Sequence, residues 1–102
     1  MGDSTPHEEL TGAVGALTSD YKAAVAAIES MSDTQEAVQS ATELVQALRT
    51  AYDGATKLRN QLALRIFETE ALSLARLADR ISVSKARADQ IVRAAKADQE
   101  EK

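Results

Sequence analysis

The 102-residue sequence has no cysteine, no tryptophan, one proline and four glycines, and its only aromatic residues are two tyrosines and one phenylalanine. The absence of cysteine excludes disulfide bonds and thiolate metal sites. Because no segment alternates apolar and polar residues with a β-branched bias, a sandwich or barrel is excluded as well. What remains is 44% hydrophobic and rich in alanine, which favours closely packed helices. The predicted fold class is all-α.

The sequence also lacks the local patterns of enzymes and membrane proteins. It has no Gly-rich phosphate loop, no metal-ligand spacing and no nucleophile elbow, and its single histidine, His7, is expected to be a solvated residue. No apolar run approaches the length that crosses a bilayer, and no signal-peptide pattern is present. We therefore expect a cytoplasmic protein without enzymatic activity, cofactor, membrane contact or small-molecule effector.

Charge is distributed unevenly along the chain, whose formal net charge is −4. Residues 1–56 hold two positive and nine negative side chains, whereas residues 57–96 hold nine positive and four negative ones. Residues 97–102 add a net −2. Phosphate groups bind basic surfaces, so residues 57–96 are the part of the chain that suits nucleic acid. An ordinary solvated helix surface is the alternative, but it leaves the segregation of charge unexplained.

Two helices with apolar stripes are predicted in the first half. Thr5 caps the first, with Pro6 at its first helical position, and Asp33 caps the second. The stripes, in alternating steps of three and four, are Leu10, Val14, Leu17, Tyr21, Ala24, Ile28 and Met31, and then Val38, Ala41, Val45, Leu48, Tyr52 and Ala55. The short connection predicts an antiparallel, coiled-coil-like hairpin over residues 6–53, which follows a disordered tail at residues 1–5. The stripes suit pairing within one chain or between chains.

Gly54, in Asp53-Gly54, weakens the second helix by about 1 kcal/mol relative to alanine, which suggests a bend or a domain boundary. A further helical stripe follows to about Thr69, with Phe67 as the expected central aromatic residue. We expect it to be the first of three helices that form one unit over residues 54–96. Residues 97–102 are expected to be a frayed acidic tail.

Residues 74–93 show the pattern of a helix, a three-residue turn and a second helix. Ser73 and Ser84 are suited to cap the two helices. Inward-facing apolar or small residues fall at Leu74, Leu77, Ala78, Ile81, Val83, Ala88 and Ile91. This spacing resembles the helix-turn-helix of bacterial repressors, resolvases and region four of sigma factors, with Ala78 where the helices cross. Ser82 stands where that class usually has glycine. Because a non-glycine residue in a left-handed turn costs roughly 1 kcal/mol, the turn is expected to differ in detail from that of the class.

The resemblance implies that the helix starting at Lys85 reads the major groove of double-stranded DNA. With Ala88, Ile91 and Ala95 inward, the outward residues are Ala86, Gln90 and Arg93, with Asp89 at the edge. Gln90 suits adenine, Arg93 suits guanine and Ala86 suits a thymine methyl group. Asp89 suits either a cytosine amino group or the orientation of Arg93. The residues assigned mainly to the phosphate backbone are Arg76, Arg80, Ser84, Lys85 and Arg87.

The sequence thus predicts a sequence-specific DNA-binding protein, a bacterial or phage transcriptional regulator that forms a homodimer through its amino-terminal helices. The alternative is a helical adaptor of the plasmid-partition or phage-packaging type, which binds a protein partner and binds DNA non-specifically or not at all. An inverted-repeat preference among DNA duplexes distinguishes the first function from the second.

Overall fold

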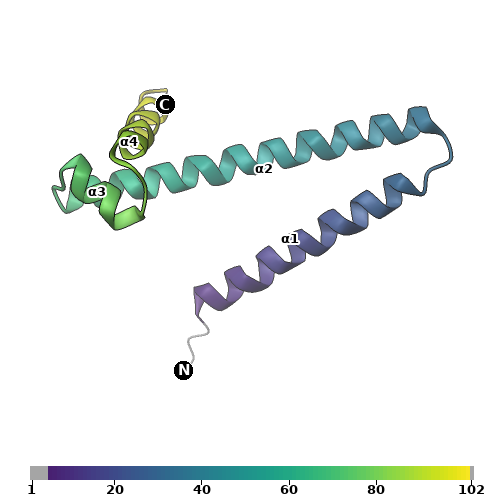
Figure 1. Ribbon diagram of the computed structural model, residues 1–102, viewed down its shortest axis with the longest axis horizontal. Coiled ribbons are helices and arrows are strands. Elements are labelled where there is room, and N and C mark those ends of the chain that lie inside the picture. Colours follow the sequence, from purple (N-terminus) through teal and green to yellow (C-terminus); the bar gives the residue numbers. More distant parts are fainter. Residues whose placement is uncertain (1–4, 102) are drawn as a thin grey trace. The chain divides into compact units, whose positions relative to one another are not determined.

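The computed structural model describes residues 5–101, and these form four helices and no strand (Figure 1). The helices are α1 (Pro6–Glu29), α2 (Thr34–Thr69), α3 (Leu74–Ile81) and α4 (Lys85–Glu100). The predicted all-α class is confirmed. The tail predicted at residues 1–5 lies outside the described residues except for Thr5, which caps α1.

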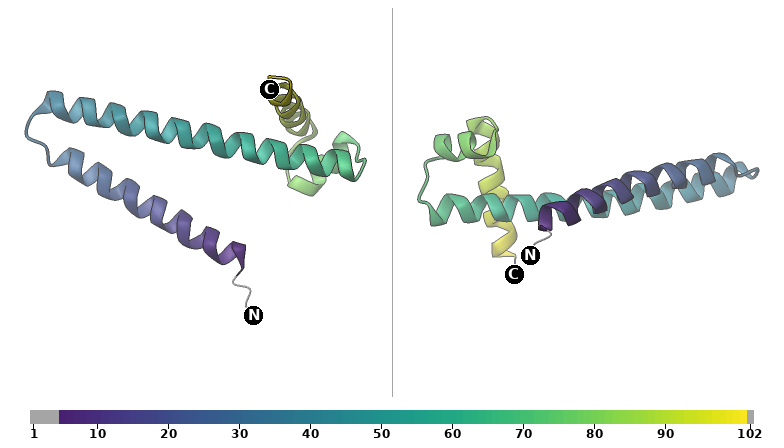
Figure 2. Two further views of the ribbon diagram at one scale, coloured as in Figure 1. Left: turned by 180° about the vertical axis from the view of Figure 1, so that it is seen from behind. Right: turned by 90° about the horizontal axis from the view of Figure 1, so that it is seen from below.

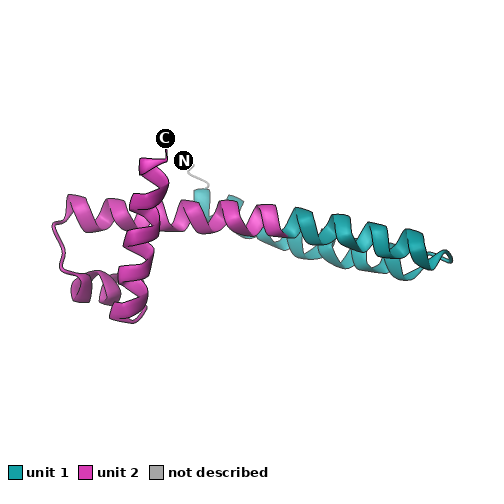
Figure 3. Cartoon of the chain, turned by 90° about the horizontal axis from the view of Figure 1, so that it is seen from above, with its two compact units in different colours: residues 1–48 teal, residues 49–102 magenta. Residues whose placement is uncertain are grey.

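The chain divides into two compact units, residues 1–48 and residues 49–102 (Figure 3). The first unit holds α1 and the beginning of α2. The second unit holds the remainder of α2 together with α3 and α4. The basic segment predicted from the sequence therefore lies in the second unit.

A side-chain oxygen caps the start of every helix, as the sequence predicts. Such caps accept hydrogen bonds from backbone N–H groups that have no partner within the helix. The capping residues and the N–H groups they accept are Thr5 from Glu8 (3.2 Å), Asp33 from Gln35 (2.9 Å), Ser73 from Arg76 (3.2 Å) and Ser84 from Arg87 (3.0 Å).

In the first unit, side chains are half-buried only near the turn between α1 and α2. α1 contributes no buried residue. The half-buried residues are Ala24, Val25, Ile28, Met31, Ala37, Ser40, Ala41 and Leu44. The earlier stripe residues of α1, Leu10, Val14, Leu17 and Tyr21, keep 47% to 66% of their surface exposed. The predicted packing of this stripe against another helix therefore stays a prediction.

α2 continues without a break through Asp53-Gly54, where the sequence suggested a bend or a boundary. The cost of one helical glycine is about 1 kcal/mol, which is small beside the cooperative hydrogen bonding of a 36-residue helix. The second helix of the predicted hairpin and the first helix of the predicted carboxyl-terminal unit are thus one helix. The compact units meet between residues 48 and 49.

The core of the second unit joins α2, α3 and α4. Its buried members are Leu64, Leu77, Ala78, Ala88, Val92 and Ala95. Leu64 and Leu77 are the two largest fully buried side chains. Phe67, expected at the centre, is half-buried and packs against this cluster from its edge.

α4 crosses the carboxyl-terminal part of α2 (Figure 2), and Ala63 of α2 and Ala95 of α4 are both buried. Gln61 Nε2 on α2 donates a hydrogen bond to the Ala95 carbonyl at 2.9 Å. Gln99 Nε2 donates in turn to Gln61 Oε1 at 3.1 Å. α4 continues to Glu100, whereas the sequence predicted a frayed tail over residues 97–102, of which Lys102 lies outside the described residues.

The turns after α2 and α3 are built in the same way. Each contains a non-glycine residue with left-handed backbone, Ala71 (φ 51°) and Ser82 (φ 61°). The next residue, Leu72 or Val83, donates its N–H to a carbonyl five residues earlier at 3.0 Å, which is the Schellman pattern of helix ends. Both residues also pack against the core cluster. Ser82 adopts the left-handed backbone in spite of its steric cost, whereas the sequence led us to expect a turn that differs in detail at this position. The left-handed Ala71 was not predicted.

Replacing either left-handed residue with glycine is expected to stabilise the protein. Ala71→Gly and Ser82→Gly each remove a steric cost of about 1–2 kcal/mol, partly offset by the greater entropy of unfolded glycine, so the expected net gain is about 0.5–1 kcal/mol. Urea denaturation measures the change. The matched control is Ala75→Gly in right-handed α3, which is expected to lose about 1 kcal/mol. A loss at position 71 equal to that at 75 would contradict the assigned turn.

Candidate nucleic-acid interface

α4 has a buried face and an exposed face. The buried residues are Ala88, Ile91, Val92 and Ala95. The exposed residues among those predicted to contact DNA are Lys85, Ala86, Arg87, Gln90 and Arg93, together with the cap Ser84. Asp89 is half-buried between the two faces. The structure therefore places the predicted inward residues inside, adds Val92 to them, and leaves the predicted base-reading residues accessible to a ligand.

Two side-chain contacts connect the exposed residues of α4. Arg87 Nη1 donates to Gln90 Oε1 at 3.2 Å, and Arg93 Nε donates to Asp89 Oδ1 at 3.1 Å. The Gln90 carbonyl oxygen has a second lone pair, so it remains able to accept from an adenine amino group while its NH₂ donates. Of the two roles open to Asp89, the observed contact is the one with Arg93, whose side chain still keeps 79% of its surface exposed.

The starts of the helices differ in charge between the two units. α1 and α2 carry glutamates in their first turns, whereas the first turns of α3 and α4 carry no acidic residue. They carry Arg76 in α3, and Lys85 and Arg87 in α4. Cations at a helix start oppose the helix dipole at a cost of about 0.3–1 kcal/mol each. The same arrangement concentrates positive potential beside free backbone N–H groups, which favours a bound anion.

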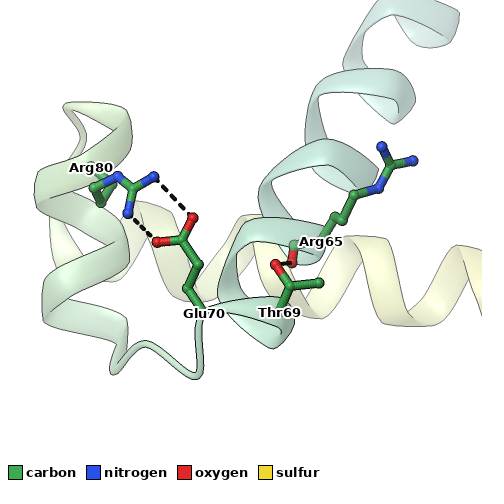
Figure 4. A network of polar contacts seen from close by, with 4 residues as sticks. All are labelled: Arg65, Thr69, Glu70 and Arg80. Carbon is green, nitrogen blue, oxygen red and sulfur yellow. Dashed lines mark hydrogen bonds and ion pairs between the residues drawn. The ribbon is translucent and has the colours of Figure 1, made fainter.

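Arg80 is engaged with Glu70 at the end of α2 (Figure 4). Its guanidinium pairs with both carboxylate oxygens, and the Nη2–Oε2 distance is 3.1 Å. The hydrogen bond from Arg80, more than the coulombic attraction, lowers the pKa of Glu70, and the same bond raises the pKa of Arg80. Arg65, on the neighbouring turn of α2, points away from this pair. Arg80 thus joins α3 to α2, a contact that the sequence did not predict.

Glu70→Gln is expected to lower the free energy of unfolding at neutral pH and to have no effect in acid. The folded-state pKa of Glu70 lies below its ordinary value of 4.5, so the contribution is complete above that value and disappears as the pH falls through the folded-state pKa. Urea denaturation across this range, at low salt, measures the change. Glu68→Gln is the control, because Glu68 is exposed and makes no ion pair among the described residues. Equal losses in the two variants at neutral pH would contradict a specific role for Glu70.

The predicted site residues fall on two helices. Ser84, Lys85, Ala86, Arg87, Asp89, Gln90 and Arg93 belong to α4 and its cap, while Arg76 and Arg80 belong to α3. The Ser84 hydroxyl already accepts the Arg87 N–H, so its first role is to begin α4. Glu70 and Gln61 were not predicted from the sequence, and their partners lie 10 to 38 residues away along the chain. No local pattern signals such contacts.

No family model, curated protein or solved structure matches this chain. Among residues 5–101, no cluster of His, Asp or Glu side chains is arranged to hold a metal ion. Over the same range, no helix combines the length and the apolar character needed to cross a membrane.

Proposed function

We propose that α3, the turn at Ser82–Ser84 and α4 form a helix-turn-helix that reads double-stranded DNA with α4 in the major groove. The observation that supports this most strongly is the two-faced character of α4. Its buried face is anchored in the core, while its exposed face begins with Lys85 and Arg87 and continues to Gln90 and Arg93. A rigid helix with a polar outer face and a cationic start has the size and chemistry that the major groove accepts.

In this proposal Gln90 and Arg93 contact base edges, with adenine and guanine as their preferred partners. Ala86 is small enough to meet a thymine methyl group. Asp89 orients Arg93 through the observed contact of 3.1 Å. Each bidentate base contact is worth about 1–3 kcal/mol of discrimination between bases.

In this proposal Lys85, Arg87 and Arg76 bind the DNA phosphates, together with the backbone N–H groups at the start of α4. These contacts fix the position of α4 on the duplex but carry no sequence information. Arg80 holds α3 to the end of α2 through Glu70, so its contribution to phosphate binding is smaller than the sequence alone suggested.

A single helix-turn-helix makes few base contacts, so proteins of this kind bind as symmetric pairs to half-sites about 34 Å apart. We therefore propose a cytoplasmic homodimeric regulator of transcription, of bacterial or phage type, that binds an inverted repeat. The amino-terminal helices supply the pairing surface in this proposal.

Selection of duplexes from a random-sequence pool, at two salt concentrations, tests this function. The expected result is enrichment of an inverted repeat, with affinity that falls steeply as salt rises. Residual binding that depends on salt but enriches no sequence would contradict base reading by α4.

The exposed stripe of α1 favours a second candidate, the helical adaptor. Leu10, Val14, Leu17 and Tyr21 present an apolar face at helical spacing, which an amphipathic helix of another protein would cover. In that case the selection experiment enriches no sequence, and Leu17→Asp abolishes partner binding while DNA affinity is unchanged.

A further inference from the structure

A second apolar stripe runs along the middle of α2. Its positions alternate in steps of three and four, as the a and d positions of a heptad do. They are Val45, Leu48, Tyr52, Ala55, Arg59 and Leu62. The large apolar members are exposed, from 41% for Leu62 to 69% for Tyr52. Leu58, which flanks the stripe, is 61% exposed.

The carboxyl-terminal end of this stripe forms one wall of an apolar groove in the second unit. The groove has a volume of about 400 Å³. Leu58, Leu62 and Ile66 of α2 line one side, and Ile81, Val83 and Ile91 line the other. The groove is therefore suited to apolar side chains from a helix that lies along α2.

The exposed area is close to what a specific dimer needs. Val45, Leu48, Tyr52, Leu58 and Leu62 together expose on the order of 500 Å², near the upper end of the largest patch on a typical monomer. Two such patches sum to about 1,000 Å², which is the lower limit for a specific interface. Pairing of two copies through this stripe accounts for the exposure of all five side chains.

We infer that α2 pairs with α2 of a second copy in antiparallel orientation, centred between Asp53 and Gly54. Antiparallel helices place a positions opposite d positions, and this stripe is self-complementary in that register. Val45 meets the partner's Leu62, Leu48 meets the partner's Arg59, and Tyr52 meets the partner's Ala55. Tyr52, the largest side chain of the stripe, thus faces the small Ala55 of the partner subunit. Val45 and Leu48 approach the groove beside the partner's Leu62.

Parallel pairing is disfavoured by the same residues. It would place Tyr52 against its own copy and Arg59 against its own copy, so that two like charges would meet in the apolar seam. In the antiparallel register the aliphatic stem of Arg59 covers the partner's Leu48. Its guanidinium keeps its hydrogen bonds to Asn60 Oδ1, at 3.2 Å from Nε and 2.9 Å from Nη2. Self-association through residues 45–62 of α2 takes the place of the amino-terminal helices as the pairing surface of the proposed homodimer, and it does not depend on DNA binding.

Single-cysteine variants of this cysteine-free chain test the register. Val45→Cys mixed with Leu62→Cys is expected to form a disulfide dimer under mild oxidation, because a disulfide requires Cα atoms within about 7 Å. Neither variant alone is expected to cross-link, since positions 45 and 62 lie about 25 Å apart along the helix. The control pair, Thr50→Cys mixed with Lys57→Cys, has the same register on the outward face of α2 and is expected to remain reduced.

Sedimentation equilibrium supplies a second readout. The wild-type chain is expected to be a dimer, and Tyr52→Lys is expected to raise the dimer dissociation constant at least 100-fold while the helical circular dichroism persists. Cross-linking of Val45→Cys alone would overturn the inference in favour of parallel pairing. A wild-type monomer at the highest soluble concentration, or equal cross-linking by the outward control pair, would overturn it entirely.

Discussion

Leu77→Ala is expected to destabilise the second unit by about 2–5 kcal/mol, the largest effect on stability among the changes proposed for this protein. Leu77 is fully buried on α3, and Leu64 is the only other large side chain buried to that degree among the described residues. The other buried members of the cluster are Val92 and alanines, which have little volume to shift into the resulting cavity. Larger side chains such as Phe67 and Ile81 pack against the cluster only from its edge, so the surrounding structure is expected to relax only partly into the cavity. Small domains have a total free energy of unfolding near about 5 kcal/mol. The expected loss is comparable with that total, so α3 and α4 are expected to be largely unfolded in this variant.

Hydrogen exchange of the amides in α3 and α4 measures this loss directly, and thermal denaturation is expected to shift down by more than about 10 °C. Leu17→Ala is the matched control, because Leu17 is 66% exposed on α1 and surface substitutions change stability by less than about 0.5 kcal/mol. Similar hydrogen-exchange protection of the α3 and α4 amides in the two variants would show that Leu77 does not anchor α3.

Gln90→Ala and Lys85→Ala are expected to impair DNA binding in different ways. Removing Gln90 takes away a base contact, so preference at one base position should fall by about 5-fold to 150-fold, or 1–3 kcal/mol, with an unchanged salt dependence. Removing Lys85 takes away a phosphate contact, so affinity should fall on all duplexes alike. The slope of log affinity against log salt should then become shallower by about 0.9.

These effects are measured by titrating duplexes that differ at single base pairs, at several salt concentrations. Arg65→Ala serves as the control, since Arg65 is an exposed arginine on α2 outside the candidate interface. Arg87→Ala is expected to combine both effects, because its guanidinium also holds Gln90 Oε1 at 3.2 Å. Equal loss on every duplex after Gln90→Ala would show that Gln90 reads no base.

The features that the sequence predicts well are local. Thr5, Asp33, Ser73 and Ser84 cap the helices as predicted, because a cap depends on a side chain and an N–H two or three residues further along. The inward face of α4 follows from helical periodicity and the position of Ala88.

The features that the sequence does not predict depend on distant partners or on cooperativity. The continuity of α2 through Gly54 reflects the length of the whole helix. The pairing of Arg80 with Glu70, and the bond from Gln61 to the Ala95 carbonyl, exist only because α3 and α4 fold against α2. Arg80 therefore looks like a free phosphate ligand in the sequence, and the structure gives it a partner.

The most direct test of the proposal that α4 reads DNA is to map the bound duplex on the protein by amide chemical-shift changes. Titration with a duplex enriched from the random pool is expected to shift the amides of Ser84 to Arg93, and those around Arg76 at the start of α3. The α1 amides from Leu10 to Tyr21 are expected to remain unchanged. Shifts confined to α1, or no shifts in α4 at duplex saturation, would contradict the proposal.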